Sequence, residues 1–232
     1  MPTLTLNKGG SIVGLEQTNQ AAARDSTTAT SAITSINTGE HLTAVQYFKS
    51  TGRGGGTFRY TRSFLQFDAS LITGTVTAAT LNVESHGTNT SADLIVIASD
   101  AFGGASSDLV DDDFNNVDFS TTYSSEITSW NTNGSNNAIT LNAAARSAIS
   151  SNNSFICAIV DHDSDFQDTD SLSGDGSQTV GIDFAGTITL VVTVAAASGP
   201  SSLASFNGVA KANIASVSGV TLASIASINT VS

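Results

Sequence analysis

Large apolar residues alternate with polar residues over much of the middle of the chain. In TFRYTRSFLQFD, residues 57–68, large side chains occupy every second position from Phe58 to Phe64. A period of two residues is typical of a strand with one buried face. Further segments of strand-like composition predict strands at 42–49, 75–85, 92–99, 137–142, 178–184 and 186–196.

The segment SFICAIVD, residues 154–161, differs because nearly all of its positions are apolar. Such a run is typical of a central strand that is buried on both faces. It brings the predicted strands to about eight, with turn residues between them. We therefore expect an all-β fold, an antiparallel β-sandwich of jelly-roll type. AAARSAIS, residues 143–150, predicts one or two helical turns across an end of the sheets.

The first part of the chain, residues 1–41, is polar and irregular. LEQTNQAAARDS, residues 15–26, predicts two or three helical turns, and a stretch of low complexity follows it. We interpret residues 1–41 as an extended N-terminal arm or linker that becomes ordered on a partner. The β-sandwich domain is then predicted over residues 42–197, and a C-terminal tail over residues 198–232.

The tail repeats itself with a period of eleven residues. Leu203, Ile214 and Ile225 each precede an Ala-Ser pair, and an apolar residue follows each pair. An eleven-residue period suits a right-handed helical supercoil, but the recurring glycines argue against one. Asn-Gly between apolar residues is a strong hairpin signal. We expect a β-strand and a two-residue turn in each unit; a disordered Ala/Ser tail is the alternative.

A β ribbon of this size buries too little apolar surface to stand alone in water. The tail therefore requires a partner, which is its own domain, sister copies of the chain or another protein. The candidate assembly residues are Leu203, Phe206, Gly208, Val209, Ile214, Val217, Gly219, Val220, Ile225 and Ile228.

The composition narrows the possible partners. Charged residues make up 12% of the 232 residues, where about a quarter is usual, and the formal net charge is −12. This acidic balance argues against binding to nucleic acid or to anionic lipid. No segment reaches the roughly 18 apolar residues of a membrane-spanning helix. We also expect no secretory signal, so that a route out of the cell would be assembly into a particle released by lysis.

Cysteine and histidine offer little chemistry. Cys157 is the only cysteine and lies in the apolar run, so we expect a buried, unreactive thiol and no intrachain disulfide. His41, His86 and His162 lack the short paired spacing of a zinc site, and the sequence predicts no such site.

Acidic residues are densest in VDHDSDFQDTDSLSGDGSQ, residues 160–178. Several carboxylates in one loop can supply the oxygen ligands that calcium prefers. The segment lacks the glycine and the glutamate of an EF-hand loop, so a solvated acidic loop is the alternative. The candidate calcium ligands are Asp161, Asp163, Asp165 and Asp168.

No motif typical of an enzyme is present. GRGGG, residues 52–56, lacks the Lys-Ser/Thr of a phosphate-binding loop, and there is no Gly-x-Ser-x-Gly. We expect no enzymatic activity and no resident cofactor. The best candidates for a glycan contact are Trp130 and Tyr123, which are amphipathic rings; the alternative for Trp130 is that it closes one end of the sandwich.

Two resemblances add to this interpretation. RSFLQFDASLITGTVTAATLNVES, residues 62–85, resembles the opening of DNRLRE-type, carbohydrate-binding-like β-sandwich modules, and the resemblance extends over residues 57–195. The acidic Arg-Glu signature of those modules is absent and there is only one Trp, so the resemblance implies the fold rather than a sugar site. The matching residues are Arg62, Leu65, Phe67, Asp68, Val76, Ala79 and Leu81.

The tail resembles the endings of structural proteins of tailed bacteriophages, through FNGVA at 206–210 and VSGV at 217–220. This resemblance implies a virion structural protein: a surface decoration, fibre or spike component held in the particle by its terminal extensions. Its partners would be other virion proteins and copies of itself, with a trimer as one arrangement. The alternative is a carbohydrate-binding module that recognises a host surface glycan with the help of calcium.

Overall fold

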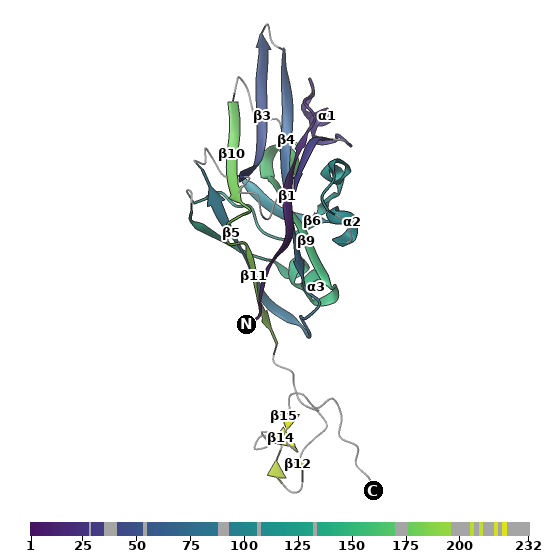
Figure 1. Ribbon diagram of the computed structural model, residues 1–232, viewed down its shortest axis with the longest axis vertical. Coiled ribbons are helices and arrows are strands. Elements are labelled where there is room, and N and C mark those ends of the chain that lie inside the picture. The colour runs from purple at the N-terminus through teal and green to yellow at the C-terminus, as the bar shows by residue number, and fades with distance from the viewer. Residues whose placement is uncertain are drawn as a thin grey trace.

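The computed structural model describes residues 1–27, 29–34, 41–52, 55–87, 93–105, 108–131, 134–169 and 176–195, and residues 205–206, 209–210, 216–217 and 220–221 of the tail. Eleven strands of this part of the chain form one curled sheet (Figure 1), and every pairing in it is antiparallel. The all-β, antiparallel prediction is confirmed. The strands are β1 (Thr3–Gly14), β2 (Ala29–Thr34), β3 (His41–Gly52), β4 (Gly55–Asp68), β5 (Val76–His86), β6 (Leu94–Ser99), β7 (Val117–Thr122), β8 (Asn136–Thr140), β9 (Ser154–Asp161), β10 (Gly176–Asp183) and β11 (Thr189–Val194).

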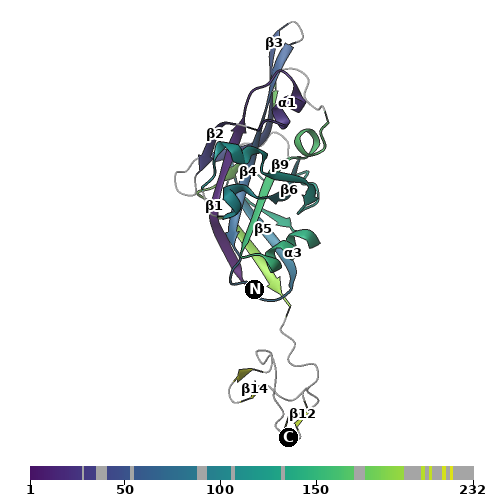
Figure 2. The same cartoon turned by 90° about the vertical axis from the view of Figure 1, so that its right-hand side faces the viewer.

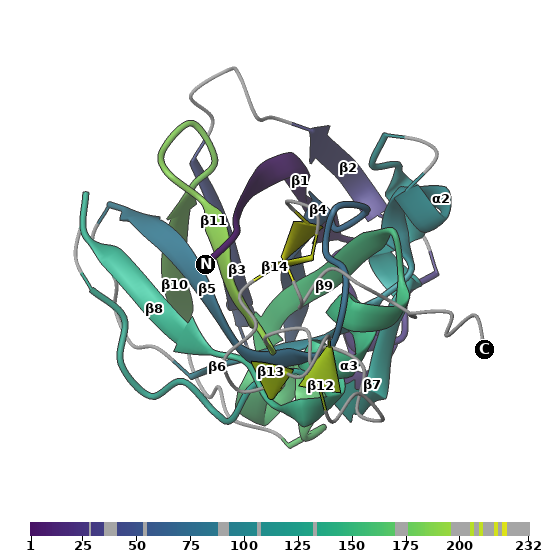
Figure 3. The same ribbon diagram turned by 90° about the horizontal axis from the view of Figure 1, so that it is seen from below.

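The sheet closes on itself through β1. Residues 3–5 of this strand pair with β11, and residues 6–13 pair with β4. The path β1-β11-β5-β10-β3-β4 therefore returns to β1, and Figure 3 shows these strands from below. A register shift between Leu6 and Lys8 lets β1 change partners. Gly9 follows this bulge, where a Cβ would come within 2.8 Å of the Phe184 ring.

The strands β4, β9 and β6 carry a hydrophobic core on each face. Phe155, Cys157 and Ile159 of β9 belong to the core inside the curled sheet. Ala158 and Val160 of the same strand belong to a second core on the opposite face. The prediction of a central strand that is buried on both faces is therefore confirmed for residues 154–161.

Short helical segments lie along one side of the body in Figure 1, and Figure 2 shows the body from that side. Asn19 caps α1, because its side chain accepts a hydrogen bond from the Ala22 N–H. The φ angle of Phe102 is 61°, and the φ angles of Gly103 and Gly104 are also positive. The segment α2 therefore contains a left-handed turn. No helix in the described ranges is long and apolar enough to cross a membrane. The helical segments are α1 (Gln20–Arg24), α2 (Ala101–Ala105), the 3₁₀ turn η1 (Asp111–Asn115), α3 (Ala143–Ser151) and the π-helical turn η2 (His162–Phe166).

The first residues of the chain belong to the body, which corrects the prediction of an N-terminal arm. β1 closes the sheet, and Ile12 is fully buried in the second core. Ala23 of α1 is buried in the same core. Residues 3–26 are therefore ordered by their own domain rather than by a partner. The helix predicted at 15–26 is confined to Gln20–Arg24.

The eight predicted strands coincide with β3, β4, β5, β6, β8, β9, β10 and β11, and the predicted turns at 143–150 coincide with α3. Three strands, β1, β2 and β7, were not predicted. The described strands of the body form one continuous antiparallel sheet, and the finer assignment to a jelly-roll sandwich remains a prediction.

Eight residues of the tail form two short hairpins, separate from the sheet of the body. β12 (Ser205–Phe206) pairs with β13 (Val209–Ala210). Eleven residues further on, β14 (Ser216–Val217) pairs with β15 (Val220–Thr221) in the same register. The rest of the predicted repeat strands lies outside the described residues, so their full length remains a prediction.

Candidate functional site

The acidic segment that follows β9 begins with a tight turn. Asp161 ends β9, and its carboxylate accepts hydrogen bonds from the N–H (2.7 Å) and the hydroxyl (2.5 Å) of Ser164. Burial raises the pKa of Asp161, while these hydrogen bonds favour its charged form. The Gln167 N–H donates to the His162 carbonyl over 2.8 Å and closes the π-helical turn η2. Asp161 thus serves as the cap of this turn.

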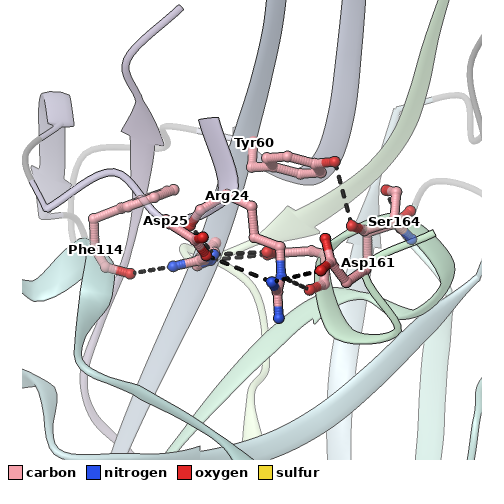
Figure 4. A network of polar contacts seen from close by, with 9 residues as sticks. Arg24, Asp25, Tyr60, Phe114, Asp161 and Ser164 are labelled. Carbon is pink, nitrogen blue, oxygen red and sulfur yellow. Dashed lines mark hydrogen bonds and ion pairs between the residues drawn. The ribbon is translucent and has the colours of Figure 1, made fainter. Parts of the chain in front are cut away.

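Asp165, inside η2, forms a buried ion pair with Arg62 of β4. The Arg62 Nε and Nη2 atoms donate to the two carboxylate oxygens over 2.8 and 2.6 Å. Arg62 also donates to the carbonyls of Phe114 and Arg24, over 2.7 and 2.8 Å. Arg62 and Asp165 are 0% and 1% exposed, so this bidentate pair is desolvated on all sides. Figure 4 shows this network with Phe114, Arg24 and Tyr60.

Asp168 completes the same network from the other side. Its carboxylate lies 3.2 Å from Arg24 Nη1, and Arg24 Nε donates to the Asp165 carbonyl over 2.7 Å. Three of the four candidate calcium ligands, Asp161, Asp165 and Asp168, are thus bound by protein donors. Their arrangement fastens η2 to β4 and α1 and does not gather their oxygens around a common point.

Asp163, the fourth candidate, faces a different group of side chains. Its Oδ1 lies 3.1 Å from Nδ1 of His162, and Asp93 Oδ1 lies 3.4 Å from the same nitrogen. Burial, reinforced by the Asp163 carboxyl, raises the pKa of Asp93 to about 6. Asp93, Glu126 and His162 each offer one possible ligand atom, and these three atoms lie within 4.8 Å of one another. Sequence reasoning missed this cluster because its members are far apart along the chain.

The two candidate glycan contacts both turn toward the body. Trp130 packs against the inner core, and its indole N–H donates to the Gly181 carbonyl over 3.2 Å. Tyr123 is 8% exposed, and its ring lies 5.2 Å from the Phe155 ring. Both rings are thus held by contacts with the body.

A groove of about 530 Å³ lies between β8, the start of α3 and the segment that precedes β8. Hydroxyl and amide side chains line most of it, above Ile139 and Leu141. Arg146 contributes a guanidinium whose Nη1 donates to the Leu141 carbonyl over 3.1 Å. Among the basic side chains that the structure describes, Lys8, Arg24, Arg59 and Arg62 have a carboxylate partner, and Arg146 has none.

The candidate assembly residues are described only in part. Phe206, Val209, Val217 and Val220 lie in the tail hairpins, where Phe206 is opposite Val209 and Val217 is opposite Val220. The other candidates lie outside the described residues: Leu203, Gly208, Ile214, Gly219, Ile225 and Ile228.

Comparison with models of known protein families and with curated proteins finds no match for this chain. The function therefore has to be inferred from the residues themselves.

Proposed function

We propose that this chain is a non-enzymatic structural protein of a tailed-phage virion, a decoration, fibre or spike component whose C-terminal repeats hold it in the assembly. The body would be a jelly-roll-like sandwich that stands outward. The observation that carries the proposal is the pair of tail hairpins, spaced eleven residues apart and separate from the sheet of the body.

The hairpins support an assembly role because each is too small to be stable alone. Each described ladder consists of two residue pairs, and an isolated two-stranded ribbon is marginal in water at best. Several copies that pair their repeats would bury the apolar positions of each unit together. With β1 built into the body, this role falls on the C-terminal tail alone.

The edges of the body offer a second means of contact. Among the described strands, β2 pairs only with β1, and β7 pairs only with β6. A strand with an unpaired edge is a template for a strand from another chain. Neighbouring virion proteins could therefore add strands at either end of the sheet.

Proteomics of purified particles tests the virion assignment. Particles produced from the genome that encodes this chain are purified on a density gradient and their proteins are quantified by mass spectrometry. We expect the chain in several copies per particle, enriched with the major structural proteins. A chain found only in the particle-free fraction of the lysate would refute the assignment.

Recognition of a host glycan is the second candidate, and the polar groove beside Arg146 favours it. Hydroxyl and amide groups can hydrogen-bond sugar hydroxyls, and no aromatic ring lines this groove. A glycan array with wild type and Arg146→Ala tests it: binding that is lost in Arg146→Ala but retained in Trp130→Phe would support the groove. Absence of any glycan signal for the wild type would remove this candidate.

A further inference from the structure

Three backbone contacts bring Asp93, Glu126 and His162 together. Asp93 precedes β6, and the next residue, Leu94, exchanges two backbone hydrogen bonds with Ile127, 3.1 and 2.7 Å long. The His162 N–H donates to the Asp93 carbonyl over 2.8 Å. Strand pairing thus fixes the three side chains next to each other, although they come from separate parts of the chain.

The spacing of two of the ligand atoms suits a tetrahedral ion. Asp93 Oδ1 and His162 Nδ1 are 3.4 Å apart. Two atoms that both lie about 2.0–2.1 Å from a tetrahedral zinc ion are separated by about 3.4 Å. The atoms therefore already lie at the distance that a shared ion requires, and Glu126 is within reach of both.

The Oδ1 atom of Asp93 lacks a hydrogen bond. This oxygen is buried and accepts no hydrogen bond, although His162 Nδ1 lies 3.4 Å from it, at the longer distance of an ion pair. A buried carboxylate oxygen without a hydrogen bond is costly, and the Asp163 carboxylate lies against the same imidazole nitrogen, 3.1 Å away. A bound cation would offset both the missing hydrogen bond and the repulsion between the carboxylates.

The His162 ring is held so that Nδ1 faces the carboxylates. Its plane stacks on Phe166 with 5.7 Å between the ring centroids. Nε2, on the far side, lies 3.4 Å from the side-chain amide of Gln167. The stacking on Phe166 and the contact with Gln167 together restrain the orientation of the ring.

We propose that Asp93, Glu126 and His162 bind a divalent transition-metal ion of the zinc type. One imidazole nitrogen and two carboxylate oxygens suit zinc better than calcium, which prefers six to eight oxygen ligands. Glu126 is exposed and also lines the groove beside Arg146, so the remaining coordination position faces solvent. Water, or a donor from a ligand or a neighbouring chain, would complete the coordination.

Titration of the full-length protein with zinc chloride tests the site. The protein is first treated with EDTA and then freed of the chelator, and heat is measured by isothermal titration calorimetry. We expect one equivalent of zinc per chain, and at least about a tenfold loss of affinity in His162→Gln. Cobalt(II) in place of zinc should give the intense visible absorption of a tetrahedral ion.

His86→Gln is the matched control, because it removes a histidine that lies outside the cluster. Its zinc affinity should equal that of the wild type. If His162→Gln fails to fold, Glu126→Gln takes its place in the titration, because it changes an exposed side chain of the same cluster. Equal zinc binding in the wild type and His162→Gln, no saturable binding, or binding of calcium but not zinc would each overturn the proposal. In those cases His162 only forms ion pairs with Asp93 and Asp163.

Discussion

Arg62 connects several segments of the body through a single side chain. It reaches from β4 to Asp165 of η2, to the Phe114 carbonyl and to the Arg24 carbonyl, and it lies over the Phe114 ring at 4.1 Å. The three residues that accept its hydrogen bonds lie in three different segments. A chain with few charges thus commits one arginine and one aspartate to joining four segments around its second core.

Removal of one partner of this pair should destabilise the body strongly. Asp165→Asn leaves the Arg62 charge buried without a carboxylate, and such losses typically cost about 3–5 kcal/mol. Urea unfolding followed by circular dichroism measures the effect. The double variant Arg62→Met/Asp165→Leu should recover a large part of the loss, because no unpaired charge remains. A loss below about 1 kcal/mol in Asp165→Asn would contradict this account.

The thiol of Cys157 should be unreactive in the folded protein. It is fully buried in β9, and burial raises its pKa, so the reactive thiolate is scarce at neutral pH. We expect iodoacetamide to label it only after unfolding in urea, as measured by intact mass. Labelling at the rate of a free thiol without denaturant would show that the inner face of β9 is not buried.

At the level of elements, β1 determines whether the sheet is closed. It joins β11 to β4, and its burial pattern changes from alternating to continuous at Gly9, where it enters the second core. A chain that begins at residue 15 should therefore lose its cooperative thermal unfolding transition. A truncation that ends at Ser198 is the matched control and should keep the transition. If the N-terminal truncation melts like the control, β1 is a dispensable arm.

Strands in which the pattern of apolar and polar residues is uninterrupted could be predicted from the sequence. Strands in which that pattern is interrupted could not. β4 and β9 stand out by alternation and by continuous apolar character. β1 was missed because the Lys8-Gly9-Gly10 stretch breaks its alternation at the bulge. β7 is short, and only Val117 and Phe119 alternate with polar residues in it, which is too brief a pattern to predict a strand.

The candidate sites depend on contacts that a sequence does not display. Spacing along the chain suggested that the aspartates after β9 share one ion, but Arg62 and Arg24 come from distant segments and bind two of them. The same limit hid the cluster of Asp93, Glu126 and His162. Its members meet only because β6 pairs with β9 and Leu94 pairs with Ile127.

At the scale of the whole molecule, the proposed function assigns different roles to the closed body and to the repetitive tail. The two described cores and the ring of strands lie within residues 1–195, so we expect the body to fold without the tail. The tail contributes two small hairpins and the eleven-residue repeat. We interpret the body as the displayed part and the tail as the part that associates.

The mass of the full-length chain in solution, measured by light scattering beside a chain that ends at Ser198, tests this division most directly. We predict a trimer or larger species for the full-length chain and a folded monomer for the shorter one. Two monomers would contradict the claim that the repeats associate with one another.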